Sequence, residues 1–68
     1  MTNIATYSVG LGAHTDGAVF NKLDSVLIHA KWLSDMGRNP RYIIEYHGAE
    51  PPRIILEGEQ LKEAIQDL

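Results

Sequence analysis

The sequence predicts a small α+β fold in which three strands form one sheet and two helices pack on one of its faces. Three observations lead to this fold class. Apolar residues alternate with a period of two in three segments, and they recur with helical spacing in two others. These segments follow one another in the order β-α-β-β-α. The length of 68 residues fits a single domain that spans residues 1–68.

The first strand is expected over residues 4–11, where period-two alternation combines with β-branched and aromatic residues. The glycines at positions 10 and 12 and the polar segment at residues 14–17 then indicate a loop. The side chains that share one side of this strand are Ala5, Tyr7, Val9 and Leu11.

A long helix is expected over residues 19–36. Thr15 or Asp16 can cap its amino end, because either side-chain oxygen can accept from free backbone N–H groups. Gly37 and Pro40 are the expected stop signals. At about 100° per residue, one arc of the helix holds the expected core residues. They are Val19, Phe20, Leu23, Val26, Leu27, Ala30 and Leu33.

A hairpin is expected from strands over residues 41–47 and 53–57, joined by a turn that contains two prolines. The side chains expected to face the helices are Tyr42, Ile44, Tyr46, Ile54 and Leu56. The opposite face would carry charges that can pair across the strands, together with two isoleucines. Its expected members are Arg41, Ile43, Glu45, Arg53, Ile55 and Glu57.

Gly58 interrupts the pattern, and a terminal helix is expected over residues 59–68. Its apolar stripe has the spacing i, i+3, i+4 and i+7 and consists of Leu61, Ala64, Ile65 and Leu68. A right-handed crossover through the long helix would make the first two strands parallel and place both helices on one face. The last strand would then lie in the middle of the sheet.

Composition narrows the functional classes. The chain has no cysteine, so disulfides and thiolate metal sites are excluded. Its net charge of −3 arises in residues 57–68, and no basic stripe of the kind found in nucleic-acid binders is present. The first residues lack an export signal, and the longest apolar run is Ile54–Leu56, so a cytoplasmic protein without a membrane partner is expected. A core this small favours a homodimer.

The glycine loop resembles two phosphate-binding patterns but departs from both. Gly10 and Gly12 match the first two glycines of a dinucleotide fingerprint, but Thr15 stands at the third position. Gly12 and Gly17 have the spacing of a phosphate loop, yet Ala18 and Val19 replace its lysine and hydroxyl residue. The loop is therefore expected to be a flexible turn into the helix, and no cofactor is predicted.

Histidines could indicate a metal site or a catalytic pair. His14 and Asp16 are two residues apart and could form a base–orienter pair, but no third ligand or nucleophile accompanies them. His29 lies outside the core arc of the long helix, and His47 closes a strand. We therefore expect no catalytic residue and no metal ligand, and we expect each histidine to be individually dispensable.

A second apolar stripe on the long helix is the most informative feature. Ile28, Trp32 and Met36 have the spacing i, i+4, i+8 and lie roughly opposite the core arc. Interfaces are enriched in Trp and Met, so this stripe predicts a protein-binding surface. The alternative is that Trp32 covers the rim of the domain or packs under the glycine loop. Acidic residues near the carboxyl end form the second part of the predicted site, although they could equally be a solvated helix face: Glu57, Glu59, Glu63 and Asp67.

Three functions follow from these observations, in order of preference. The first is a non-enzymatic protein-binding module that inhibits or modulates a larger host machine, with a basic nucleic-acid-binding protein as a candidate partner. Its size and acidic character are typical of phage or mobile-element accessory proteins such as anti-CRISPR proteins, which is an analogy alone. The second is a small nucleic-acid-binding regulator that uses Lys22, Lys31, Arg38, Arg41 and Arg53. The third is a small enzyme that depends on His14 and Asp16.

Overall fold

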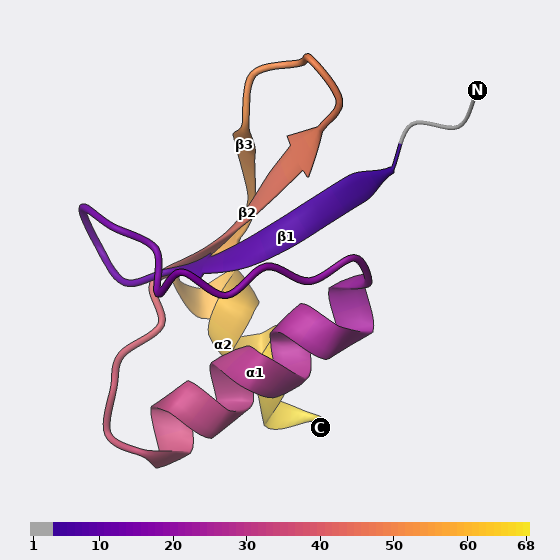
Figure 1. The fold of residues 1–68 in the computed structure, drawn as a ribbon. Helices are drawn as coiled ribbons and strands as arrows, with labels where there is room; N and C mark the ends of the chain where they lie inside the picture. The colour runs from indigo at the N-terminus through magenta and orange to yellow at the C-terminus, as the bar shows by residue number, and fades with distance from the viewer. Residues whose placement is uncertain (1–3) are drawn as a thin grey trace.

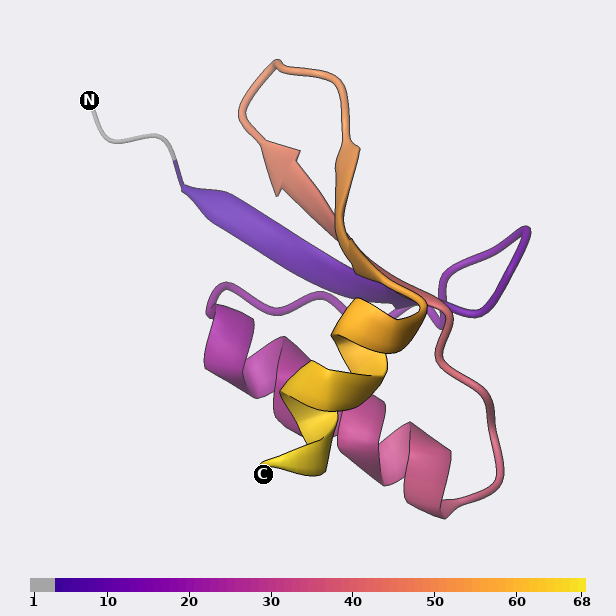
Figure 2. The ribbon, with the colours of Figure 1, turned by 180° about the vertical axis from the view of Figure 1, so that it is seen from behind.

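A computed structural model describes residues 4–68. Residues 1–3, which belong to the segment expected to lack an export signal, lie outside the described residues. The elements follow the predicted order β-α-β-β-α (Figure 1). Their bounds are β1 Ala5–Gly10, α1 Leu23–Asp35, β2 Tyr42–His47, β3 Arg53–Glu57 and α2 Glu59–Gln66. The three strands form one sheet, and both helices lie on the same face of it, which confirms the predicted fold class (Figures 1 and 2).

The sheet is antiparallel throughout, with the order β1-β2-β3, so the expected parallel pair with the last strand in the middle is wrong. The cause is the segment at residues 15–20, which we call the return segment. It runs back along the outer edge of β1, where Tyr7 and Phe20 exchange backbone hydrogen bonds of 2.7 and 2.9 Å. The chain therefore reverses once more before α1 begins, and β2 must run opposite to β1 (Figure 1).

The return segment also corrects the start of the long helix, which begins at Leu23 instead of residue 19. Lys22 is the N-cap residue and has an extended backbone, whereas Thr15 and Asp16 lie outside the helix and do not cap it. Val19, expected in the core, is 63% exposed. Extended pairing with β1 satisfies backbone groups of this segment, and that gain overrides its helical pattern.

The carboxyl end of α1 is built as predicted. Gly37 has a φ of 87°, a left-handed value that glycine adopts without a steric cost. The N–H of Gly37 donates to the carbonyl of Ser34 at 3.0 Å, and the N–H of Arg38 donates to the carbonyl of Leu33 at 2.9 Å. These two bonds form a Schellman motif, which satisfies carbonyls that the helix end would otherwise leave free.

The core lies between the sheet and the two helices. Val9 of β1 is paired with Ile43 of β2, and both side chains are completely buried. The helices contribute Val26, Ala30 and Leu33 from α1 and Leu61 and Ile65 from α2. The last two confirm the stripe expected for the terminal helix, whereas Leu68 lies beyond its end and is exposed.

The faces of β2 are opposite to the expectation. Because Ile43 points into the core, its neighbours Tyr42 and Ile44 lie on the face that the helices leave uncovered, and Tyr46 follows them by alternation. Burying a tyrosine requires a partner for its hydroxyl, whereas Ile43 brings no polar atom into the core. The hydroxyl of Tyr42 finds its partner outside the core, where it donates to the carbonyl of Gly12 at 2.8 Å.

An irregularity in β3 changes the faces of the hairpin as well. Ile43 is paired with Leu56 but Ile44 is paired with Ile54, so Ile55 is an extra residue on this strand. Ile55 and Leu56 both pack against the core, whereas Ile54, expected to be buried, is 47% exposed. The predicted cross-strand charge pair is present, with Nε of Arg53 donating to Oε1 of Glu45 at 3.0 Å.

Within residues 4–68, neither helix has the length and apolar character needed to cross a membrane.

Candidate protein-binding site

The predicted apolar stripe lies on the outer side of α1. Ile28, Trp32 and Met36 are 60%, 54% and 58% exposed, although each is a large apolar side chain. Residues four apart on a helix are neighbours, so the three side chains form one continuous line. The buried face of the same helix is turned toward the sheet through Val26 and Ala30. A two-layer fold can cover only that face, which explains why the stripe stays open.

Trp32 is exposed on one side and supported on the other. Its ring is stacked on the ring of His29, with 5.5 Å between centroids and 24° between planes. His29 in turn packs against Phe20, at 5.0 Å and a tilt of 42°. Phe20 belongs to the return segment, so Trp32 does lean toward the rim of the domain, as the alternative interpretation expected. More than half of its surface nevertheless remains accessible.

Asp16 holds the other side of His29. Its Oδ2 is bonded to Nε2 of His29, and its Oδ1 accepts from the backbone N–H of Ala18 at 3.2 Å. The Asp16 side chain is 8% exposed and that of His29 is 20% exposed. The partner of Asp16 is therefore His29 and not His14, which is exposed in the glycine loop. His29 is thus held in a tertiary contact between Asp16 and Phe20, and whether it is individually dispensable stays a prediction to be tested.

Sequence reasoning misses this contact because Asp16 and His29 are thirteen residues apart, and the pattern predicts a flexible loop at Asp16 and a helix from residue 19 in place of a segment paired with β1. One signal was available. His29 and Trp32 have the spacing i, i+3, which places two rings on neighbouring positions of a helix surface. Their connection to Phe20 and Asp16 depends on the return segment, which only the structure shows.

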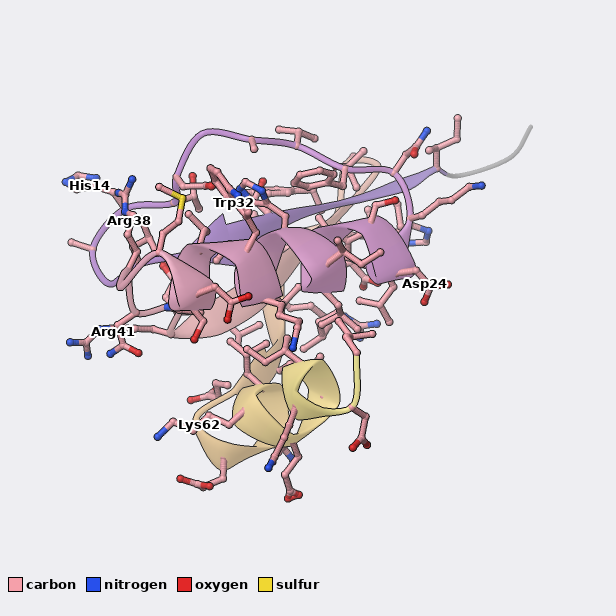
Figure 3. The ribbon with its side chains drawn as sticks, turned by 90° about the horizontal axis from the view of Figure 1, so that it is seen from below. His14, Asp24, Trp32, Arg38, Arg41 and Lys62 are labelled. Carbon is pink, nitrogen blue, oxygen red and sulfur yellow. The ribbon has the colours of Figure 1, made fainter. Side chains whose placement is uncertain are left out.

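The predicted acidic residues lie elsewhere. Glu57 ends β3, while Glu59, Glu63 and Asp67 belong to α2 or to its carboxyl end. Figure 3 shows Trp32 on the flank of α1 near the return segment and Lys62, on α2, beyond the opposite flank. The structure therefore does not join the apolar stripe and these carboxylates into one continuous surface.

Two other carboxylates do border the stripe. Asp24 precedes Ile28 by four residues, and Asp35 follows Trp32 by three, so both are neighbours of the stripe on the helix surface. Both side chains are exposed. The site that the structure assembles is thus an apolar line on α1 and its C-cap Met36, bordered by these two carboxylates and by Lys31, which follows Ile28 by three residues.

Basic side chains gather at another part of the molecule. His14, Arg38 and Arg41 lie at the same end in Figure 3, near the glycine loop. A Cβ at Gly12 would lie 3.9 Å from Cδ and Nε of Arg41, so this side chain follows the loop. The loop closes on itself through a hydrogen bond from Leu11 N–H to the His14 carbonyl at 2.8 Å, and it leads into the return segment instead of a helix. It therefore lacks the helix amino end that phosphate loops use.

No group of three or more His, Asp or Glu side chains in the described part of the chain is placed to hold a metal ion. His47, the remaining histidine, lies with Nδ1 3.4 Å from Oε2 of Glu50 in the hairpin turn.

Comparison with known proteins returned no matching family model, curated protein or solved structure. Function therefore has to be inferred from the surface itself.

Proposed function

We propose that this chain is a non-enzymatic protein-binding module whose contact surface is centred on Trp32. The single observation that supports this most strongly is the exposed line of Ile28, Trp32 and Met36 on a helix whose other face is fully used by the core. Single exposed apolar residues are ordinary, but a contiguous stripe that contains tryptophan is typical of an interaction site.

The borders of the stripe indicate the chemistry of the partner. Asp24 and Asp35 would face the rim of any surface that receives Trp32, so a basic rim around an apolar slot fits best. Complementary charge raises the association rate and excludes wrong partners more than it adds affinity. The net charge of −3 works in the same direction over longer distances.

A basic surface that normally holds nucleic acid is one such partner. We propose that the chain acts in the cytoplasm as an inhibitor or modulator of a larger machine with such a surface. An origin as a phage or mobile-element accessory protein, anti-CRISPR proteins included, is an analogy from size and acidic character. The acidic residues of α2 would then serve long-range attraction and not direct contact with the Trp32 slot.

The same stripe is suited to a homodimer, which we propose as the state of the free chain. In an antiparallel two-fold pairing about Trp32, Ile28 of one copy would lie opposite Met36 of the other. Such a contact would cover the stripe until a partner competes for it. The outer edge of β1 is a weaker alternative, because the return segment already pairs with it.

The test compares variants in a binding assay with the partner captured from the native host. Trp32→Ala is expected to weaken binding roughly thirtyfold, the equivalent of ~2 kcal/mol, because truncating a central tryptophan commonly has that effect. Its far-UV circular dichroism should stay that of the folded chain, since Trp32 is not a core residue. A fully buried tryptophan would instead cost about 3–5 kcal/mol of folding stability.

Ile28→Ala and Ile54→Ala form a matched control pair, because both remove an exposed isoleucine side chain from different faces of the molecule. Only the first should weaken binding. Equal loss in both variants, or unchanged binding by folded Trp32→Ala, contradicts the proposal.

A second candidate, a nucleic-acid-binding regulator, is favoured by one observation, the placement of His14, Arg38 and Arg41 at one end. Phosphate contacts make affinity fall steeply with salt. Binding to generic DNA at low salt that disappears in Arg38→Ala and Arg41→Ala, but not in Trp32→Ala, would favour this candidate over the first.

A further inference from the structure

The side chains behind Trp32 form a connected support that starts at the sheet. The N–H of Asp16 donates to the carbonyl of Val9 at 3.1 Å, which ties the return segment to β1. The carboxylate of Asp16 is held in turn by the N–H of Ala18 at 3.2 Å. Asp16 therefore has a fixed position before it contacts His29.

Asp16 determines the orientation of the His29 ring. Oδ2 of Asp16 is bonded to Nε2 of His29, and a carboxylate oxygen accepts from the tautomer that carries its proton on Nε2. Phe20 packs against the same ring. One edge of the imidazole is thus held by Asp16 and the ring is supported by Phe20.

Trp32 rests on this fixed ring. The stack of His29 and Trp32, with 24° between planes, restricts the rotamers of an indole that would otherwise be free on an exposed helix surface. A side chain that is already ordered loses less conformational entropy when it binds. Asp16 and His29 can therefore raise the binding affinity of the stripe without touching the partner themselves.

We propose that Asp16 and His29 are positioning residues that hold Trp32 in one orientation, so that the chain presents a rigid indole to a preformed apolar slot. The role of this positioning in binding rests on the proposed function, because it concerns the same stripe of Ile28, Trp32 and Met36. The ordering of Trp32 by these residues is a property of the single chain, so it is measured at a concentration low enough for the chain to be monomeric.

Trp32 is the only tryptophan in the sequence, so intrinsic fluorescence reports on it alone. Time-resolved anisotropy of the wild-type chain should decay mainly with overall tumbling. In Asp16→Ala and His29→Ala, the amplitude of the fast picosecond-to-nanosecond decay should rise above that of the wild-type chain, because side-chain motion on this timescale is released. Near-ultraviolet circular dichroism of the indole should weaken in parallel.

His29→Phe separates stacking from hydrogen bonding, since it keeps an aromatic ring but removes the donor to Asp16. It should show an intermediate fast amplitude. His14→Ala and His47→Ala are matched controls, because they remove histidines that do not contact Trp32, and they should leave the anisotropy decay unchanged. Far-UV circular dichroism and urea unfolding identify variants that are not folded. This matters because a variant that only loses stability could also release Trp32, and such a variant is left out of the comparison.

A mobile Trp32 in the wild-type chain overturns the proposal without any variant. An unchanged fast amplitude in folded Asp16→Ala and His29→Ala overturns it as well, even if both variants are less stable. If Trp32 is ordered by these residues but folded Trp32→Ala binds the partner normally, the positioning stands and the proposed binding function fails. If Trp32 is mobile but essential for binding, the reverse holds.

Discussion

At the scale of single residues, the contact between Gly10 and Tyr42 shows how a small residue in β1 is used on the uncovered face of the sheet. A Cβ at position 10 would lie 2.0 Å from Cε1 and Cζ of Tyr42, because the tyrosine ring lies directly across the glycine. The ring then reaches the glycine loop, where its hydroxyl donates to the carbonyl of Gly12. The need for glycine at this position is therefore steric.

We expect Gly10→Ala to lower the free energy of unfolding by about 1–3 kcal/mol, the usual cost of overpacking a filled site. Urea unfolding measures the change. Tyr42→Ala removes the obstructing ring, so the double variant should lose less stability than the sum of the single changes. Strictly additive losses would show that the two residues do not compete for the same space.

The three histidines are expected to differ in their effect on stability. His14→Ala and His47→Ala should each change the free energy of unfolding by less than about 0.5 kcal/mol, as surface substitutions usually do. His29→Ala should cost about 1–3 kcal/mol, because it leaves Oδ2 of the largely buried Asp16 carboxylate without its partner, while Oδ1 keeps the N–H of Ala18. Thermal and urea unfolding of the three variants would reveal this order, and three equal effects would contradict it.

At the scale of the elements, the return segment has more influence on the fold than its lack of regular structure suggests. It pairs with β1 through Tyr7 and Phe20, and the hydroxyl of Ser8, a buried side chain, donates to the carbonyl of Ala18 at 2.8 Å. It also covers one edge of the sheet, and an open edge is a template for unwanted pairing. The other edge is β3, where the extra residue Ile55 interrupts regular pairing, and such irregularities make an edge a poorer template for a further strand.

Amide hydrogen exchange tests this role of the return segment. The N–H groups of Tyr7 and Phe20 bond to each other's carbonyls, so both should be protected to a degree similar to amides between β1 and β2. A helix that began at residue 19 would instead leave the N–H of Phe20 free in its first turn. Fast exchange at Phe20 in a folded sample would therefore contradict the observed path of the chain.

At the scale of the whole molecule, apolar side chains of residues 4–68 that lie outside the core include a stripe on α1 and a group on the far side of the sheet. The α1 stripe consists of side chains that are more than half exposed. On the sheet, Tyr42, Ile44 and Tyr46 are partly buried, Tyr42 has a partner for its hydroxyl, and only Ile54, paired with Ile44, is classed as exposed, at 47%. The α1 stripe is thus the surface with the most apolar area still to gain from association.

Sedimentation at increasing concentration tests whether this area drives self-association. We expect a dimer at high micromolar concentration, since a chain of 68 residues has a marginal core and gains stability from a second copy. Trp32→Ala should shift the equilibrium toward the monomer, whereas Ile54→Ala should not. A folded, stable and strictly monomeric wild-type chain at that concentration would contradict the expectation.

Most of the elements could be predicted from local pattern, but their partners could not. The spacing of Leu61 and Ile65 and the Gly37 stop signal are local, so they identified α2 and the end of α1 correctly. The direction of β2 depends on a segment between Thr15 and Phe20 that runs back along β1, and neither the loop signals at residues 14–17 nor the helical pattern from residue 19 predicts that pairing. The candidate site shows the same division, because the stripe follows from spacing while its support by Asp16 follows from the chain path.

The sequence by itself determined the order of the elements, the apolar stripe on α1 and the acidic character of the carboxyl end, because each depends on residues close together in the chain. Only the tertiary structure decided which face of β2 is buried, which strand is central and which residues hold Trp32. These depend on pairings such as Val9 with Ile43 and Asp16 with His29. Such pairings depend on the free energy of the complete fold, in which burial of apolar side chains and backbone pairing outweigh local secondary-structure propensity.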